Sequence, residues 1–138
     1  MIKISVDVDG TLLLKSVQQY MKELVDRGID VWVTTRRFED MDLYTKDFQR
    51  AYGIINLARG HEKLFEICSE IGIPREKIRF TNMDNKYKYL GENEGFLWHL
   101  DDDQFEIDDI NKYTETIGIS CSNGSNWKHK CDRFIKKN

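Results

Sequence analysis

Two acidic residues, Asp7 and Asp9, follow the apolar run that opens the chain, and Gly10 and Thr11 come directly after them. The run over residues 2–8 predicts a buried strand. Because side chains at positions i and i+2 of a strand point to the same side, both carboxylates are expected to emerge together at its carboxyl end. Two neighbouring carboxylates repel each other unless a cation lies between them, so this pair favours a divalent metal ion and phosphoryl chemistry. The alternative interpretation is a solvated, aspartate-rich turn.

Further polar side chains stand beside the ends of the later predicted strands. They are Thr34, Thr35, Arg36 and Arg37 after the second strand, Lys86 and Lys88 before the fourth, and Asp101, Asp102 and Asp103 after it. Taken singly, each type has an ordinary explanation, as a β-branched strand residue, a solvated lysine or an acid that caps a helix. His99, in the middle of the fourth strand, fits a core histidine with satisfied hydrogen bonds better than a functional one. It is the order of the whole set along the chain that indicates one site.

These residues are carried by alternating strand and helix signals. Apolar or β-rich runs predict strands over residues 2–8, 29–35, 77–81, 96–100 and 116–121. Helical spacing of apolar residues predicts helices over residues 17–25, 38–52, 61–71, 84–90, 105–113 and 127–135. The alternation predicts an α/β fold: a single domain over residues 1–138, with a three-layer, Rossmann-like parallel sheet and helices on both faces. The carboxyl ends of its strands would meet at one edge, where open α/β sheets bind ligands.

Composition narrows the class of protein. The 138 residues suffice for one domain with a proper core, and shares of 40% hydrophobic and 33% charged residues are typical of a globular protein. The net charge of -3 gives no overall nucleic-acid signature, and no apolar run approaches the ~20 residues of a membrane span. Cys68, Cys121 and Cys131 form no C-x-x-C pair, so we expect neither a disulfide framework nor a zinc knuckle, and a reducing, cytoplasmic setting.

The order of the candidate residues resembles that of the haloacid dehalogenase-like (HAD) superfamily of phosphohydrolases, over nearly the whole chain. Residues 6–11 (VDVDGT) correspond to its first motif and residues 100–102 (LDD) to its fourth, with Thr34 and Lys86 in the order of the second and third. The resemblance implies a HAD-like fold and Mg2+-dependent hydrolysis of a phosphomonoester. Members commonly insert a cap domain after the first or second motif. Here core elements fill both intervals, so we expect a capless protein whose open site is covered by a large substrate or by a partner subunit of a homo-oligomer.

The resemblance also implies roles for the acidic residues. Asp7 would be the nucleophile that forms an aspartyl-phosphate, and Asp9 would protonate the leaving oxygen and then activate water. Mg2+ would be held by an Asp7 oxygen, the Asp9 backbone carbonyl and Asp102. Asp101 would support this set, and Asp103 remains an alternative ligand.

The remaining candidates are assigned to the phosphoryl group and the substrate. Thr34 would hydrogen-bond the phosphoryl group, and Lys86 would neutralise its charge, with Lys88 as the competing lysine. Guanidinium groups after the second strand suit the oxygens of a further phosphate. The expected substrate-binding residues are Gly10, Thr35, Arg36 and Arg37.

The expected substrate is a nucleotide phosphate or a nucleic-acid end. Residues 127–137 are basic with interleaved aromatic residues, although a solvated terminal helix explains them equally well. Residues 96–119 loosely resemble the phosphatase domain of phage polynucleotide kinases, which is also capless. A HAD-like protein that binds or sequesters a phosphorylated nucleotide or signal without turnover is the alternative. A receiver-like phospho-acceptor domain fits less well, because the third predicted strand ends in Phe80-Thr81-Asn82 without an aspartate.

Overall fold

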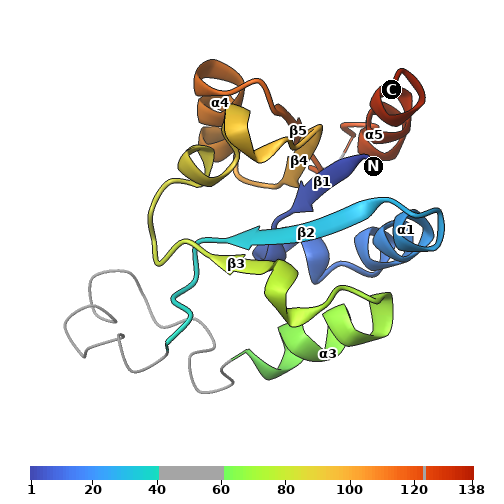
Figure 1. Ribbon diagram of the computed structural model, residues 1–138, viewed down its shortest axis with the longest axis vertical. Helices are drawn as coiled ribbons and strands as arrows, with labels where there is room; N and C mark the ends of the chain where they lie inside the picture. Colours follow the sequence, from blue (N-terminus) through green and yellow to red (C-terminus); the bar gives the residue numbers. More distant parts are fainter. Residues whose placement is uncertain (41–60, 123) are drawn as a thin grey trace.

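A five-stranded parallel sheet in the order β3-β2-β1-β4-β5 forms the centre of the molecule (Figure 1). The computed structural model describes residues 1–40, 61–122 and 124–138. The strands are β1 (Lys3–Val6), β2 (Asp30–Thr35), β3 (Ile78–Phe80), β4 (Trp98–Asp101) and β5 (Ile117–Ser120). The predicted α/β class and the parallel sheet are confirmed. Each of the five predicted strands is found, shortened at one end or both, except that the fourth gains Asp101.

Four of the predicted helices begin and end within two residues of the expected ranges. They are α1 (Lys15–Asp26), α3 (Glu62–Ile71), α4 (Gln104–Tyr113) and α5 (Trp127–Lys136). The helix predicted over residues 84–90 is wrong in type, since only a short 3-10 turn, η5 (Lys86–Tyr89), is present. Tertiary contacts of the buried Lys86, rather than helical propensity, fix this segment. Of the helix predicted over residues 38–52, residues 38–40 are not helical and the rest lies outside the described residues.

The two faces of the sheet differ in chemistry. Alternate strand residues such as Ile4, Val33 and Leu100 join the large apolar core, which packs against α1, α3 and α5. The opposite face carries polar side chains, among them Ser5 and His99, and α4 covers it together with a small apolar cluster. Figure 1 shows α4 on the side of the sheet away from α1 and α3. The described elements therefore form three layers, with helices on both faces as predicted.

The direction in which the chain winds explains this arrangement. From β1 the chain passes through α1 to β2 and through α3 to β3, whereas β4 and β5 lie on the other side of β1. Right-handed crossovers in opposite directions place their helices on opposite faces. The strand order therefore reverses between β1 and β4, and ligands of open α/β sheets bind in the crevice outside the carboxyl ends at such a switch point.

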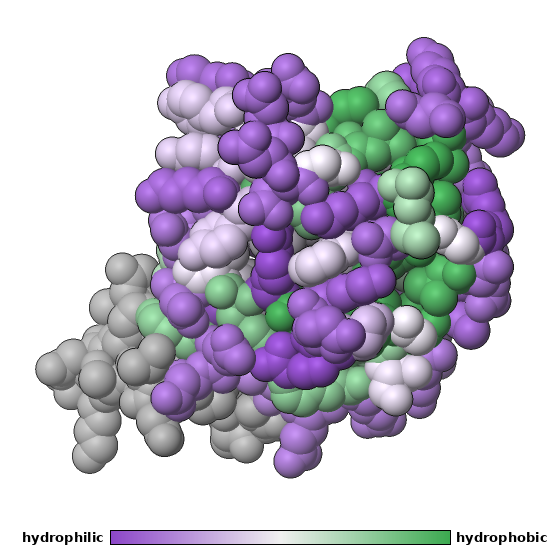
Figure 2. All heavy atoms as spheres, viewed as in Figure 1, coloured by the Kyte–Doolittle hydropathy of each residue, from purple (hydrophilic) through white to green (hydrophobic). Residues whose placement is uncertain are grey.

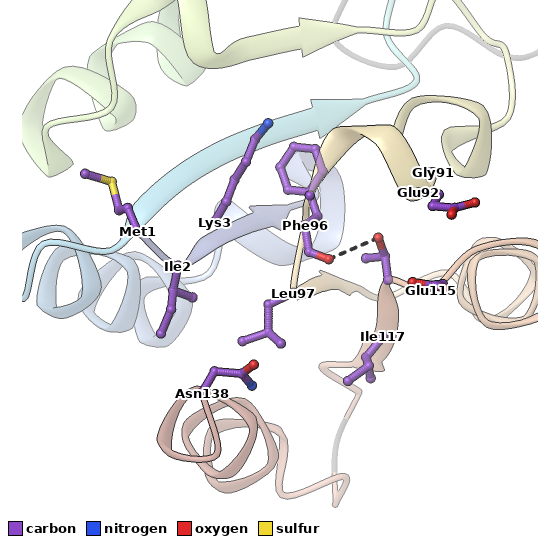
Figure 3. Close-up of a pocket in the computed structure, with 12 residues that line it drawn as sticks. Met1, Ile2, Lys3, Gly91, Glu92, Phe96, Leu97, Glu115, Ile117 and Asn138 are labelled. Atoms are coloured by element: carbon purple, nitrogen blue, oxygen red, sulfur yellow. Dashed lines mark hydrogen bonds between the residues drawn. The ribbon is translucent and has the colours of Figure 1, made fainter.

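Two further features lie away from that crevice: an apolar side of the surface and a pocket at the amino ends of the strands. Figure 2 shows apolar residues gathered on the side of α1 and α5, with polar residues over much of the remaining visible surface. A pocket of about 380 Å³ lies where β1, β4 and β5 begin, lined by Lys3, Phe96, Leu97, Ile117 and their neighbours (Figure 3). It is at the opposite end of the strands from Asp7, Asp101 and Asp102. Within the described residues, no helix combines the length and apolarity needed to cross a membrane.

Candidate active site

A buried lysine joins two carboxylates at the switch point between β1 and β4. Lys86 Nζ lies 2.7 Å from Asp7 Oδ1 and 2.6 Å from Asp101 Oδ2. Lys86 exposes only 3% of its side chain, so these ion pairs lie away from bulk water. Asp7 directly follows β1, and Asp101 is the last residue of β4, so neighbouring strand ends bring the two acids together.

The structure distinguishes the two candidate lysines. Lys88 is exposed, and its ammonium pairs with Asp84 at 3.0 Å, one turn earlier in the chain. The 3-10 turn that contains both residues points Lys86 inward and Lys88 outward. Of the two, Lys86 is the one that reaches the carboxylates.

Asp102 completes a group of three acids that could hold a metal ion. Asp7, Asp101 and Asp102 each offer one oxygen within 4.8 Å of the others. The Thr11 hydroxyl lies between two of them, 3.1 Å from Asp7 Oδ2 and 3.4 Å from Asp102 Oδ1. A Cβ atom on Gly10 would lie 2.1 Å from Asp102 Oδ2, and Gly10 has a φ of 78°. Glycine therefore both permits the turn and leaves the space that the Asp102 carboxylate fills.

Asp101 is held from both of its oxygens. His99 Nε2 lies 2.8 Å from Asp101 Oδ2, and the Asp103 backbone N–H donates to Asp101 Oδ1 at 3.0 Å. Burial acts in the opposite sense, but the hydrogen bond from His99 and the charge of Lys86 hold the pKa of Asp101 below its usual range. Asp103 itself caps α4, since its Oδ1 accepts from the Phe105 N–H at 3.0 Å. Its carboxylate thus serves the helix, as acids at an N-cap commonly do.

The electrostatics of the group are unbalanced without a further cation. Lys86 pairs with two of the three carboxylates, Asp7 and Asp101, so full ionisation of these four side chains leaves an excess of two negative charges. Burial raises the pKa of Asp7 well above its usual range, and Lys86 opposes this only in part. The charge and the oxygen donors of this group fit a hard divalent cation.

Asp9 does not join this group, contrary to the expected convergence of both carboxylates. Its side chain is 56% exposed and makes a bidentate ion pair with Arg37, at 2.7 and 2.9 Å. The reason is that β1 ends at Val6 and the chain turns through η1 (Val8–Leu12), so strand alternation no longer governs Asp9. Arg37 lies two residues after β2, and we call the pair that it forms with the exposed Asp9 the mouth of the site.

The two threonines of β2 are buried rather than open to the crevice. Thr34 Oγ1 lies 2.9 Å from the hydroxyl oxygen of Ser5, and the side chain of Thr34 has no exposed surface. Thr35 Oγ1 accepts from the Arg37 N–H at 3.3 Å. Both hydroxyls therefore have partners within the fold, and the Thr34 hydroxyl is not open to the crevice.

A buried glutamate that the sequence analysis does not name belongs to the surroundings of the site. Glu106 Oε2 accepts from the Lys86 backbone N–H at 3.1 Å, and its Oε1 lies 3.3 Å from the Arg36 guanidinium. Arg36 also donates to the Met83 carbonyl at 2.8 Å, so it is directed into the fold. Burial raises the pKa of Glu106. The signal available in the sequence was the position of Glu106 three residues after Asp103, the N-cap of α4, because the first turn of that helix faces η5.

Comparison with known proteins adds no assignment. A scan against protein-family models gives no match, and neither does a search of curated protein sequences.

Proposed function

We propose that this chain is a Mg2+-dependent phosphomonoester hydrolase of the HAD type. The single observation that carries the proposal is the shared ion pair of Lys86 with Asp7 and Asp101, beside Asp102, at the carboxyl ends of β1 and β4. A nucleophilic carboxylate, a fixed cation and a group of oxygen donors are the parts that phosphoryl transfer requires. Their place at the switch point of a parallel sheet supports the same conclusion.

The metal-binding residues in this proposal are Asp7 and Asp102. Both present an oxygen toward Thr11, and Asp102 fills the space over Gly10. Asp101 keeps its two oxygens on Lys86, His99 and the Asp103 N–H, so it supports the site rather than supplying the main ligand. When bound, Mg2+ would neutralise the excess negative charge and polarise the phosphoryl oxygens.

The chemical steps in this proposal are those that the resemblance implies. An Asp7 oxygen attacks phosphorus, the bond from phosphorus to the leaving oxygen breaks, and Asp9 gives that oxygen its proton. Water then attacks phosphorus, Asp9 takes a proton from the water, and the bond from phosphorus to Asp7 breaks, which releases phosphate. Lys86 stays charged throughout and stabilises the negative charge on Asp7 and on the phosphoryl oxygens.

Arg37 has two roles in this scheme: it pairs with Asp9, and it can bind a phosphate group. In the free protein it holds Asp9 by two hydrogen bonds. A phosphate group entering the mouth offers the guanidinium the same fork of two oxygens as a carboxylate does. Exchange of Asp9 for phosphate on Arg37 would release the Asp9 carboxylate, which takes up a proton from solvent and then gives it to the leaving oxygen.

We propose a nucleotide or a nucleic-acid end as the substrate, and Arg37 at the mouth of the site supports this. The basic helix α5 gives less support than its sequence suggests, because it packs on α1. Lys128 lies 3.6 Å from Glu23, and Asp132 accepts from the Tyr20 hydroxyl at 2.6 Å. Part of its polar face is therefore used within the fold.

Phosphate release tests the proposal. Nucleoside 5′- and 3′-monophosphates, 5′- and 3′-phosphorylated oligonucleotides, p-nitrophenyl phosphate and a sugar phosphate would each be assayed with Mg2+ and with EDTA. We expect hydrolysis of a nucleotide or oligonucleotide that EDTA abolishes and that Asp7→Asn lowers by about 10³-fold or more. The exposed Asp108→Asn on α4 is the matched control and should keep full activity. Turnover that survives both EDTA and Asp7→Asn would refute the enzyme, and activity confined to the sugar phosphate would refute the substrate class.

The second candidate is a protein that binds a phosphorylated nucleotide without turnover. The observation that favours it is the bidentate pairing of Asp9 with Arg37, which occupies the residue needed as acid and base. Calorimetry with a nucleoside monophosphate separates the two functions. A binder should keep or gain affinity in Asp7→Asn while neither protein releases phosphate.

A further inference from the structure

A continuous line of polar side chains runs beneath the candidate site, across the face of the sheet that α4 covers. Ser5 Oγ lies 2.9 Å from Thr34 Oγ1 on one side and 2.9 Å from His99 Nδ1 on the other. His99 Nε2 then lies 2.8 Å from Asp101 Oδ2, which Lys86 also contacts. All five side chains are buried, and the parallel register pairs Ser5 with His99 directly. The line therefore connects β2, β1 and β4 to Lys86.

The hydrogen inventory of these groups fixes the direction of the bond between His99 and Asp101. Lys86 and the Asp103 N–H both donate to Asp101, which favours its ionised form, and a carboxylate can only accept. His99 Nε2 must therefore carry the hydrogen and donate to Asp101 Oδ2. On the other side of the ring, Ser5 donates its hydroxyl hydrogen to Thr34 Oγ1, and the Ser5 oxygen stands 2.9 Å from His99 Nδ1.

We propose that His99 is a positioning residue for the hydrolase: with a hydrogen on Nε2, it orients Asp101 and through it the Lys86 ammonium against Asp7. The proposal rests on the proposed function for its catalytic part only. His99 is the second donor on the one oxygen of Asp101 that faces Lys86. Without it, that oxygen could rotate toward the metal-binding side, and Lys86 would no longer be shared evenly with Asp7. Groups that orient ligands in this way affect metal affinity or activity by about 10- to 100-fold.

The tautomer can be measured without any assay of activity. In protein carrying 15N-labelled histidine, protonated and bare ring nitrogens have clearly separate 15N shifts, and His99 is assigned by the signals lost in His99→Gln. We expect a proton on Nε2, the nitrogen that faces Asp101. Ser5→Ala should move the Nδ1 signal and leave Nε2 protonated. A proton on Nδ1 with a bare Nε2 would overturn the proposal.

Two amide variants separate positioning from packing. The amide nitrogen of Gln reaches the place of Nε2 and can donate to Asp101, whereas the shorter Asn reaches only the place of Nδ1. We expect His99→Gln to keep kcat within a few-fold and His99→Asn to lower it about 10- to 100-fold with KM unchanged. Thermal unfolding of both variants is measured alongside, because a purely structural role predicts equal losses. The exposed His129→Gln on α5 is the control.

Magnesium affinity gives a readout that does not depend on turnover. Calorimetry should show Mg2+ binding retained in His99→Gln and weakened in His99→Asn. If the wild-type chain hydrolyses no phosphomonoester, the proposed function fails, while the tautomer and the difference in Mg2+ affinity still decide the role of His99. Equal kcat and equal Mg2+ affinity in the two variants would overturn it.

Discussion

The positive charge of Lys86 is important to the electrostatics of the site. It is almost fully buried, and two carboxylates depend on its charge. Burial acts against the charged ammonium, but Asp7 and Asp101 raise the pKa of Lys86 above its usual range, so it stays charged. A buried ion pair contributes little beyond an apolar replacement, yet removing one partner leaves uncompensated charge behind.

We therefore expect Lys86→Met to lower the free energy of unfolding by about 3–5 kcal/mol and to abolish phosphate release. Urea unfolding followed by circular dichroism gives the first quantity. Lys88→Met is the matched control, two residues away on the same turn but exposed, and should change neither stability nor activity. Equal losses in the two variants would show that the sharing of Lys86 between the acids is not important.

Gly10 tests the position of Asp102. In Gly10→Ala the new Cβ would occupy the space of the Asp102 carboxylate, so we expect Mg2+ affinity to fall by about tenfold or more. The positive φ adds a strain of about 1–2 kcal/mol to the folded state. Gly28→Ala is the control, because Gly28 has a φ of 82° and its Cβ would meet no described atom within 4 Å. Calorimetry should find Mg2+ affinity unchanged in this control, and a similar fall in both would count against Asp102 as a ligand.

At the level of elements, α4 connects the end of β4 to the lysine. Asp103 caps its first turn, and Glu106 in the same turn accepts from the Lys86 backbone N–H. The helix thus fixes the position of η5 and, through the ion pair of Glu106 with Arg36, the end of β2. A short 3-10 turn has weak internal hydrogen bonds, so this outside support decides where Lys86 lies.

Glu106→Gln is expected to lower the free energy of unfolding by about 1–3 kcal/mol and to slow phosphate release. A neutral amide can accept from the Lys86 N–H with its oxygen only if its NH2 group faces the Arg36 guanidinium, so one buried donor loses its partner. Denaturant unfolding and steady-state kinetics measure the two effects. Asp108→Asn on the exposed side of the same helix should show neither, and a Glu106→Gln protein with unchanged kinetics would remove α4 from the account of the site.

For the whole molecule, the excess negative charge links metal binding to stability. A cation that binds the folded chain alone adds RT ln(1 + [L]/Kd), about 2.7 kcal/mol at a concentration of 100 Kd. We expect Mg2+ to raise the melting temperature in proportion, and Asp102→Asn to remove this dependence. Glu66→Gln, an exposed acid on α3, should keep it. Equal effects of Mg2+ and of matched ionic strength from NaCl would indicate screening in place of a site.

The sequence by itself determined the α/β class, the parallel sheet and the presence of acids beyond the ends of β1 and β4. These follow from local apolar periodicity and from the position of polar residues directly after a strand, both of which are properties of neighbouring residues. The lysine that pairs with the acids could be narrowed in the same way to two candidates, Lys86 and Lys88. Because residues two apart on a turn face different directions, only one of them can reach the acids.

The tertiary structure alone decided the partners. Lys86 meets Asp7 across 79 positions of sequence, and Asp9 meets Arg37 across 28. β1 ends at Val6, three residues before Asp9, so strand alternation does not keep Asp9 with Asp7, and the register between β1 and β4 sets His99 beside Ser5. Local pattern cannot give such contacts, because they depend on how separate elements pack and on which buried polar groups must satisfy one another.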